Sequence, residues 1–224
     1  MKAIIFDLDG TLVDSAPDIH AATEKMLQEI GQPVLSLETV TSFIGNGVPK
    51  LVERVIAARG LDAHFDADDF LARFMRHYAA AATEKTRLYP HVAEALQMLG
   101  DDGYALGLCT NKPKAPTALV LEAFDLARFF DVVVCGDTLP VKKPDPAPLQ
   151  LAIERLGATG SVYVGDSEVD AATAKGAAVP FALFTEGYRK SDVSDIPKTY
   201  SFSDFAELSV VIDKVFVAQA LPKP

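Results

Sequence analysis

The sequence opens with the stretch that decides its fold, KAIIFDLDGTLV at residues 2–13. Residues 3–6 form an apolar run that is too short for a helix, which predicts a strand buried on both faces. The run continues into Asp-Leu-Asp-Gly-Thr, so Asp7 and Asp9 stand where the strand passes into a loop. Carboxylates so close together repel each other and lose hydration, and they need a cation or a shared proton. An acidic turn without chemistry is the alternative for this stretch alone.

The composition predicts a globular protein with a sizeable core. The chain has 224 residues, of which 49% are hydrophobic, enough for one large domain or a domain with an insertion. Its formal net charge of −10 argues against nucleic acid or an anionic membrane as a partner. No apolar run approaches the roughly 20 residues of a membrane span. The start of the chain lacks the pattern of a signal peptide, so we expect a cytoplasmic protein in which Cys109 and Cys135 are buried free thiols.

Residues 15–82 carry a helical pattern without a strand-like run. Apolar side chains recur at helical spacing near residues 15–30, 36–44, 48–60 and 66–82. The stretch Gly45-Asn46-Gly47 separates the second of these helices from the third. We therefore expect a small all-helical domain, residues 15–82, inserted into another domain.

From residue 88 onward, apolar strand-like runs alternate with helical patterns. Strands are expected at 104–109, 131–135, 161–164, 181–184 and near 200–202, and helices at 90–99, 113–124, 146–156, 169–175 and 203–217. This alternation predicts an α/β domain, a doubly wound parallel sheet with helices on both faces. Because the first strand has no partner within the insertion, this core would be discontinuous, with residues 1–14 and 83–224. The tail at 221–224 is expected to be frayed.

Polar residues follow the strands that this sheet would contain. Ligands of such sheets bind beyond the carboxyl ends of the strands, where the chain carries Asp7 and Asp9, Thr110-Asn111, Lys142-Lys143-Pro144, and Asp166 with Asp170. Asp166 and Asp170 have the spacing that places two side chains on one side of a helix. Mg²⁺ prefers oxygen ligands such as carboxylates and a phosphate oxygen, and Lys143 could hold further phosphate oxygens. The pattern therefore suits Mg²⁺ together with a phosphoryl group.

These stretches occur in an order that resembles a known superfamily. Asp-Leu-Asp-Gly-Thr, a strand ending in Thr-Asn, Lys-Lys-Pro-Asp-Pro and Gly-Asp-Ser-x-x-Asp look like the four motifs of the haloacid dehalogenase superfamily of aspartate-nucleophile phosphatases. The insertion resembles the helical C1 cap of that superfamily, and the resemblance covers nearly the whole chain. Residues 13–19, 110–113 and 136–139 are similar to phosphoglycolate phosphatases. The dehalogenases lack the second aspartate of the first motif, so the presence of Asp9 implies phosphate chemistry.

The resemblance implies a role for each residue of the motifs. Asp7 would be the nucleophile, Asp9 the general acid and base, Thr110 and Asn111 phosphate ligands, and Lys143 the motif lysine. Mg²⁺ would be bound by Asp7, by Asp166 and by the backbone carbonyl of Asp9, with support from Asp170. We expect the neighbouring Lys142 to be a solvated loop charge.

A cap would exclude water and select the leaving group. Gly45-Asn46-Gly47 would then lie over the site, and Lys50 or Arg54 would meet a substrate carboxylate. A small acidic ester such as 2-phosphoglycolate would account for a cation there. The alternative is an ordinary turn between helices, with Lys50 and Arg54 on a solvated face.

The function expected from the resemblance is a Mg²⁺-dependent phosphatase that hydrolyses a small phosphomonoester through an aspartyl phosphate, most like phosphoglycolate phosphatase. A sugar-phosphate mutase or a pyrophosphatase of the same fold is the nearest alternative. A phosphonate hydrolase would need a lysine in the cap that forms a Schiff base. Residues 15–82 contain two lysines, Lys25 and Lys50, and the sequence marks neither as buried. A non-catalytic phosphate sensor is the alternative of another class. The partner would be a small phosphate ester, and the protein a monomer or homodimer.

Overall fold

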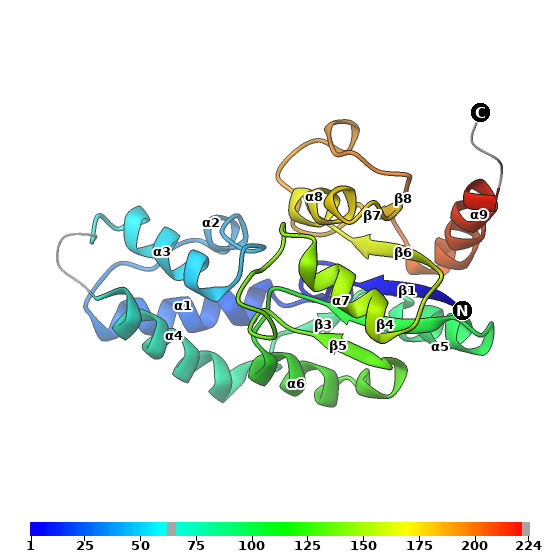
Figure 1. Ribbon diagram of the computed structural model, residues 1–224. Helices are drawn as coiled ribbons and strands as arrows, with labels where there is room; N and C mark the ends of the chain where they lie inside the picture. Colours follow the sequence, from blue (N-terminus) through cyan, green and yellow to red (C-terminus); the bar gives the residue numbers. More distant parts are fainter. Residues whose placement is uncertain (62–65, 221–224) are drawn as a thin grey trace.

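A computed structural model describes residues 1–61 and 66–220 of the chain. Within these ranges lies a six-stranded sheet in the order β5-β4-β1-β6-β7-β8 (Figure 1). Its strands are β1 (Lys2–Phe6), β4 (Ala105–Cys109), β5 (Val132–Val134), β6 (Gly160–Gly165), β7 (Phe181–Phe184) and β8 (Tyr200–Phe202). Every pairing in this sheet is parallel. The predicted strands and the predicted parallel sheet are therefore confirmed.

The central strand β1 is buried on both faces, as its apolar run predicts. Ile4 pairs with Leu106 of β4 on one side and with Val162 of β6 on the other. Ile4 and Phe6 join one hydrophobic cluster, whereas Ala3 and Ile5 join the cluster on the opposite face. Because both faces of the strand are covered from Ala3 onward, no polar residue follows Lys2 until Asp7.

Helices cover the two faces of the sheet. The cluster that contains Phe6 includes residues of α5 (Val92–Asp101), α6 (Lys114–Ala123) and α9 (Leu208–Ala220). The cluster that contains Ile5 includes residues of α7 (Ala147–Arg155) and α8 (Glu168–Gly176). Short 3₁₀ turns lie at η1 (Ala127–Phe129), η2 (Val193–Asp195) and η3 (Phe205–Glu207). The last helix was expected from residue 203, but its first turn is the separate η3; the tail expected to fray lies outside the described residues.

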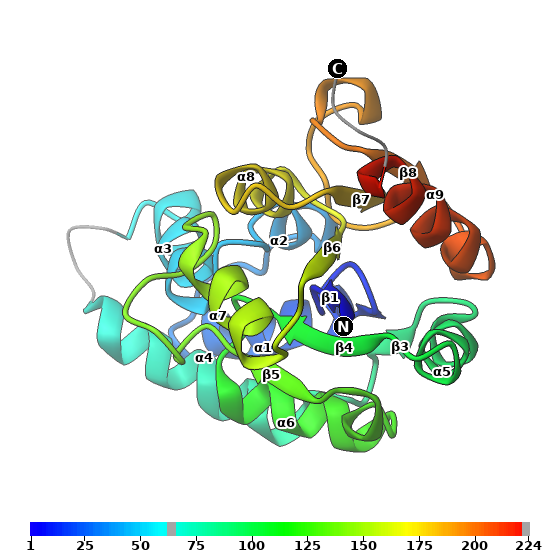
Figure 2. The same cartoon turned by 45° about the vertical axis from the view of Figure 1, so that its right-hand side comes forward.

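The helices between residues 15 and 82 pack around a core of their own. They are α1 (Ala16–Glu29), α2 (Leu37–Thr41), α3 (Val48–Ala58) and α4 (Ala67–Ala81), and residues 15–61 and 66–82 contain no strand. Their shared cluster includes Met26, Val55, Phe70 and Phe74. In Figures 1 and 2, α3 and α9 lie at opposite ends of the molecule. We call these four helices the cap and keep its predicted limits, 15–82, as a proposal, together with a core of 1–14 and 83–224.

The chain passes from core to cap before α1 and back to the core after α4, and these two connecting segments pair in a way that the sequence did not predict. β2 (Val13–Asp14) and β3 (Arg87–Leu88) form an antiparallel pair, which is too short to carry a periodic pattern. Beside it, the buried Asp18 carboxylate accepts hydrogen bonds from the Lys85 N–H at 3.0 Å, the Thr86 N–H at 2.7 Å and the Thr86 hydroxyl at 2.6 Å. Asp18 thus ties the first turn of α1 to the strand that returns to the core.

Both cysteines are buried and free, as expected. Among the described residues, no helix is long and apolar enough to cross a membrane.

We predict that Asp18→Ala lowers the free energy of unfolding by about 2–3 kcal/mol, because it leaves the buried Thr86 N–H and hydroxyl, and the partly buried Lys85 N–H, without their charged acceptor. Equilibrium urea unfolding followed by circular dichroism measures this loss. Asp102→Ala, at an exposed carboxylate beyond α5, is the control and should change stability by less than about 0.5 kcal/mol. A similar small change for both variants would contradict the assigned role of Asp18.

Candidate active site

Residues from four separate parts of the sequence meet at the carboxyl ends of the strands. Asp7 follows β1, Thr110 and Asn111 follow β4, Lys143 lies in the loop between β5 and α7, and Asp166 follows β6. Carboxylate oxygens of Asp7, Asp166 and Asp170 all lie within 4.8 Å of one another. The structure therefore brings together the residues that the four motifs single out.

Lys143 is the buried cation at the centre of this cluster. Its side chain is 1% exposed, and its Nζ donates hydrogen bonds to Asp170 Oδ1 at 2.7 Å and to the Tyr163 hydroxyl at 2.8 Å. Nζ also lies 2.9 Å from Asp7 Oδ1 as an ion pair. That buried oxygen receives no hydrogen bond from any described residue. Burial raises the pKa of Asp7 to about 7, although Lys143 opposes the shift.

Asp166 is held in place by two donors from distant parts of the chain. Its Oδ1 accepts from the Thr11 hydroxyl at 2.8 Å, and its Oδ2 accepts from the Tyr188 N–H at 2.6 Å. Burial raises the pKa of Asp166, and the nearby Asp170 and Asp7 raise it further. Gly10 has a φ of +86°, and a Cβ there would lie 2.5 Å from Asp166 Oδ2. The glycine of the first motif is thus required both by the turn and by the approach of this carboxylate.

Both carboxylate oxygens of Asp170 accept hydrogen bonds from other groups of the protein. Oδ1 accepts from Lys143 and from the Tyr163 hydroxyl at 2.9 Å, and Oδ2 accepts from the Ser167 hydroxyl at 2.6 Å. Burial opposes its ionisation, but Lys143 and these hydrogen bonds outweigh burial and lower the pKa of Asp170. Ser167 in turn caps α8. This geometry supports the expectation that Asp170 helps the metal site indirectly, by holding Lys143 and the start of α8.

The cluster fits a hard divalent cation. Three buried carboxylates lie close to one lysine, which leaves an excess of negative charge in a place with little solvent. Asp7 Oδ1 has no hydrogen-bond donor among the described residues, and the donor set consists of oxygens. Asp7 and Asp166 are the side chains with capacity left for a cation, and Asp9 has its backbone carbonyl nearby in the chain. Oxygen-only sites of this kind suit Mg²⁺ or Ca²⁺.

Asp9 pairs with a lysine to which the sequence assigned no role. Asp9 Oδ1 accepts from the Ser15 hydroxyl at 2.6 Å and from Lys112 Nζ at 2.7 Å, and Lys112 also donates to the Tyr78 hydroxyl of α4. The Lys112 side chain is 2% exposed. Burial opposes its charge, but Asp9 and Tyr78 outweigh burial and raise the pKa of Lys112. The available signal was the stretch Thr110-Asn111-Lys112-Pro113, in which a lysine directly follows a buried strand end.

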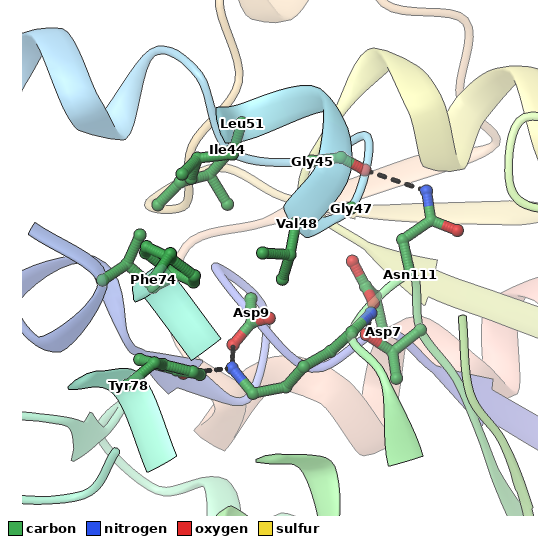
Figure 3. Close-up of a pocket in the computed structure, with 13 residues that line it drawn as sticks. Asp7, Asp9, Ile44, Gly45, Gly47, Val48, Leu51, Phe74, Tyr78 and Asn111 are labelled. Atoms are coloured by element: carbon green, nitrogen blue, oxygen red, sulfur yellow. Dashed lines mark hydrogen bonds and ion pairs between the residues drawn. The ribbon is translucent and has the colours of Figure 1, made fainter. Parts of the chain in front are cut away.

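Asn111 joins three segments around the pocket. Its Nδ2 donates to the Gly45 carbonyl at 3.0 Å and to the Lys143 carbonyl at 2.9 Å, and its Oδ1 accepts from the Lys143 N–H at 3.0 Å. Figure 3 shows the bond to Gly45 across the top of the pocket. The Asn111 side chain therefore holds the cap loop and the Lys143 loop, and the binding of phosphate by Asn111 stays a prediction. The Thr110 hydroxyl lies at the pocket and accepts from the Lys112 N–H at 3.2 Å.

The cap loop lies over the site, but its basic neighbours point elsewhere. Gly45 and Gly47 line the pocket. Arg54 donates hydrogen bonds to the Phe43 carbonyl at 2.7 Å and to Asn46 Oδ1 at 2.8 Å, so its guanidinium group binds the loop itself.

Two lysines near this loop also differ from expectation. Lys50 pairs with Glu53 at 2.6 Å on the surface. The expected contact of Lys50 or Arg54 with a substrate carboxylate therefore finds no support in this geometry. Lys142 is half-buried rather than solvated, because the cap loop at Gly47 covers it.

Between cap and core lies a small cavity of about 40 Å³, measured as the space open to the centre of a water molecule. Polar groups of Asp7, Asp9, Thr110, Asn111, Lys112 and Tyr78 line one side of it. Apolar residues of the cap line the other, namely Ile19, Ile44, Val48, Leu51 and Phe74 (Figure 3). One water needs roughly 10–15 Å³ by this measure, so the space suits a group of a few atoms.

Comparisons with known proteins agree on one family. A family model described as haloacid dehalogenase-like hydrolase matches residues 4–184. A phosphoglycolate phosphatase of Cereibacter sphaeroides is 51% identical over 210 residues, covering 93% of this chain and 96% of that protein. One from Rhodospirillum rubrum is 43% identical over 214 residues, covering 92% and 89%. A crystal structure of a predicted phosphoglycolate phosphatase from Haemophilus somnus aligns with a TM-score of 0.89 at 31% identity, covering 95% of this chain and 98% of that one.

The raised pKa of Asp7 predicts that, with divalent cations chelated, the protein loses stability as the pH rises from about 4 to about 7. The unfolded chain releases this proton near the ordinary value of 3.8, whereas the folded protein keeps it up to about 7. Over this range the unfolded state binds fewer protons, so the free energy of unfolding falls. Asp7→Asn should remove that part of the decrease, and Mg²⁺ should oppose it by binding the ionised carboxylate.

Urea unfolding at pH 5 and pH 8, in chelator and in Mg²⁺, tests this for wild type and Asp7→Asn. The same pH dependence in both proteins would show that Asp7 titrates normally.

Proposed function

Since the chain belongs to the haloacid dehalogenase-like hydrolases, we propose that it is a Mg²⁺-dependent phosphatase that hydrolyses 2-phosphoglycolate through an aspartyl phosphate on Asp7. The observation that carries this proposal is the buried Asp7 carboxylate, whose Oδ1 lies 2.9 Å from Lys143 Nζ and which has carboxylate oxygens of Asp166 and Asp170 within 4.8 Å. The names of the relatives from Cereibacter and Rhodospirillum support the substrate. The family expected from the four motifs is confirmed by the family model.

Binding of a phosphate ester brings a dianion toward an anionic nucleophile. Lys143, 2.9 Å from Asp7 Oδ1, offsets part of the repulsion, and Asp170 keeps the ammonium group in place. Thr110 and Asn111 line the pocket, and the Thr110 hydroxyl and the Asn111 N–H would hold phosphate oxygens. Asp7, Asp166 and the Asp9 carbonyl would hold Mg²⁺, which would further neutralise the charge of the phosphate.

The first chemical step forms one bond and breaks another. An Asp7 oxygen attacks phosphorus in line with the leaving oxygen, and the bond between phosphorus and that oxygen breaks. Asp9 donates a proton to the departing alkoxide. Its Oδ1 is fixed by Ser15 and Lys112, while Oδ2 accepts no hydrogen bond from the described residues and is the atom available for proton transfer.

The second step returns the enzyme to its starting form. Asp9, now ionised, takes a proton from water, and the resulting hydroxide displaces Asp7 from phosphorus. Phosphate leaves with the water oxygen, and Asp7 regains its carboxylate. Closure of the cap, with Asn111 bound to Gly45 and Lys112 bound to Tyr78, keeps bulk water from the site in the first step.

The size of the cavity favours a small leaving group. A space of about 40 Å³ suits glycolate better than a hexose, which favours a small phosphate ester as the substrate. A phosphonate hydrolase finds no support, because Lys50 is paired with Glu53 on the surface and Lys25 is exposed. We further propose a cytoplasmic enzyme whose partner is a small phosphate ester and not nucleic acid or membrane, as a monomer or homodimer.

Asp7→Asn should lower kcat for 2-phosphoglycolate by roughly 1,000-fold or more, because an amide is a poor nucleophile toward phosphorus. Phosphate release in Mg²⁺ and in chelator measures the effect, and wild type in chelator should also lose activity. Asp102→Asn serves as a surface control with unchanged turnover. Full turnover by Asp7→Asn would falsify the proposed mechanism.

Asp9→Asn should separate the two steps, because a nitrophenolate leaving group needs no proton whereas an alkoxide does. With p-nitrophenyl phosphate we expect a burst of about one nitrophenolate for each active site, followed by slow turnover. With 2-phosphoglycolate the first step itself should slow by roughly 100- to 10,000-fold. Stopped-flow absorbance and rapid quench measure these phases; equal slowing of both substrates without a burst would remove Asp9 from the role of acid and base.

A further inference from the structure

The pocket contains a buried cation that the proposed phosphate chemistry does not use. Lys112 Nζ has three N–H donors, of which one goes to Asp9 Oδ1 and one to the Tyr78 hydroxyl. No described residue accepts the third, although the Lys112 side chain is only 2% exposed and lines the cavity.

Tyr78 offers a second donor at the same place. Its hydroxyl oxygen accepts from Lys112, so its own hydrogen is left over, and no described residue accepts it. The Tyr78 ring is buried and stacks on Phe74 with 5.5 Å between ring centroids, which fixes the hydroxyl at the polar end of the cavity (Figure 3). Two donors from different domains of the fold therefore converge, one from the end of β4 and one from α4.

The charges around the cavity give this pair a specific ligand. The other ionisable side chains that line it are Asp7 and Asp9, both acids, and Lys112 is the basic one among its lining residues. Lys143 is already surrounded by Asp7, Asp170 and Tyr163. Lys112 would therefore offset the charge of an acidic leaving group that enters this cavity beside Asp9, whereas Lys190 lines a separate hollow on the Asp166 side.

The spacing agrees with a short hydroxy acid. Asp9 must contact the bridging oxygen to protonate it, and Lys112 Nζ lies 2.7 Å from Asp9 Oδ1. In glycolate a single methylene separates that oxygen from the carboxylate. The carboxylate would thus lie within reach of Lys112 and Tyr78 while the phosphoryl group lies at Asp7.

We propose that Lys112 and the Tyr78 hydroxyl bind the carboxylate of the leaving group and so select acidic phosphate esters over neutral ones. This inference rests on the proposed function. It transfers to Lys112 the role that the sequence suggested for Lys50 or Arg54. Because Tyr78 belongs to the cap and Lys112 to the core, the bound carboxylate would also hold the cap closed.

The test compares two esters that differ only in this group, 2-phosphoglycolate and 2-hydroxyethyl phosphate. In Lys112→Met, kcat/KM for both should fall because Asp9 loses its partner, but the preference for 2-phosphoglycolate should fall by a further 10- to 100-fold or so. The inhibition constant of glycolate should rise in parallel. Lys114→Met, an exposed lysine two positions further on, is the matched control and should keep the wild-type preference.

Tyr78→Phe provides a second test that keeps the ring and its stacking on Phe74. It should lower the preference for the acidic ester by roughly 3- to 10-fold. If Lys112→Met does not fold, as judged by circular dichroism, Tyr78→Phe alone decides. An unchanged preference in the folded variants would overturn the inference and leave Lys112 as a positioning residue for Asp9. Failure of wild type to cleave either ester in Mg²⁺ would instead overturn the proposed function.

Discussion

The interaction on which the structure depends is the burial of Lys143 among carboxylates. A buried ammonium group, here 1% exposed, needs charged partners. Its partners are Asp170, in the first turn of α8, and Asp7, directly after β1. The ends of β1, β5 and β6 must therefore meet at one edge of the sheet. Since one lysine does not balance three acids, the same arrangement leaves negative charge at Asp7 and Asp166, where a cation can bind. Folding thus prepares both the nucleophile and a place for a cation.

A second buried lysine relates the cap to this edge. Lys112 joins Asp9 of the core to Tyr78 of the cap, and Asn111, its neighbour, joins the Gly45 carbonyl to the Lys143 loop. Both residues lie in the loop after β4. This loop therefore contacts both the part of the pocket where phosphate would bind and the part where the leaving group would bind. Asp18 and the β2–β3 pair hold together the two segments that connect the cap to the core. Selection of the leaving group and protection from water would then depend on the same closed arrangement.

Most of the fold could be predicted because its signals are local. The run at residues 3–6 must be a strand buried on both faces, and the alternation after residue 88 requires a parallel sheet. The meeting of Asp7, Lys143 and Asp166 could be predicted because strand ends in such a sheet converge. Three features could not be. The β2–β3 pair is too short for periodicity, the partners of Lys112 lie on distant elements, and helical spacing alone does not show that Arg54 turns toward Phe43 and Asn46.

The central claim is that phosphate passes through the Asp7 carboxylate. The most direct measurement is peptide mass spectrometry of enzyme quenched in acid during turnover of 2-phosphoglycolate with Mg²⁺, since acyl phosphates survive such conditions long enough to be mapped. We expect one added phosphoryl group on the peptide that contains Asp7, and none when turnover is blocked by chelator. Steady turnover with a phosphoryl group on a different residue, or with none on this peptide at any quench time, would contradict it.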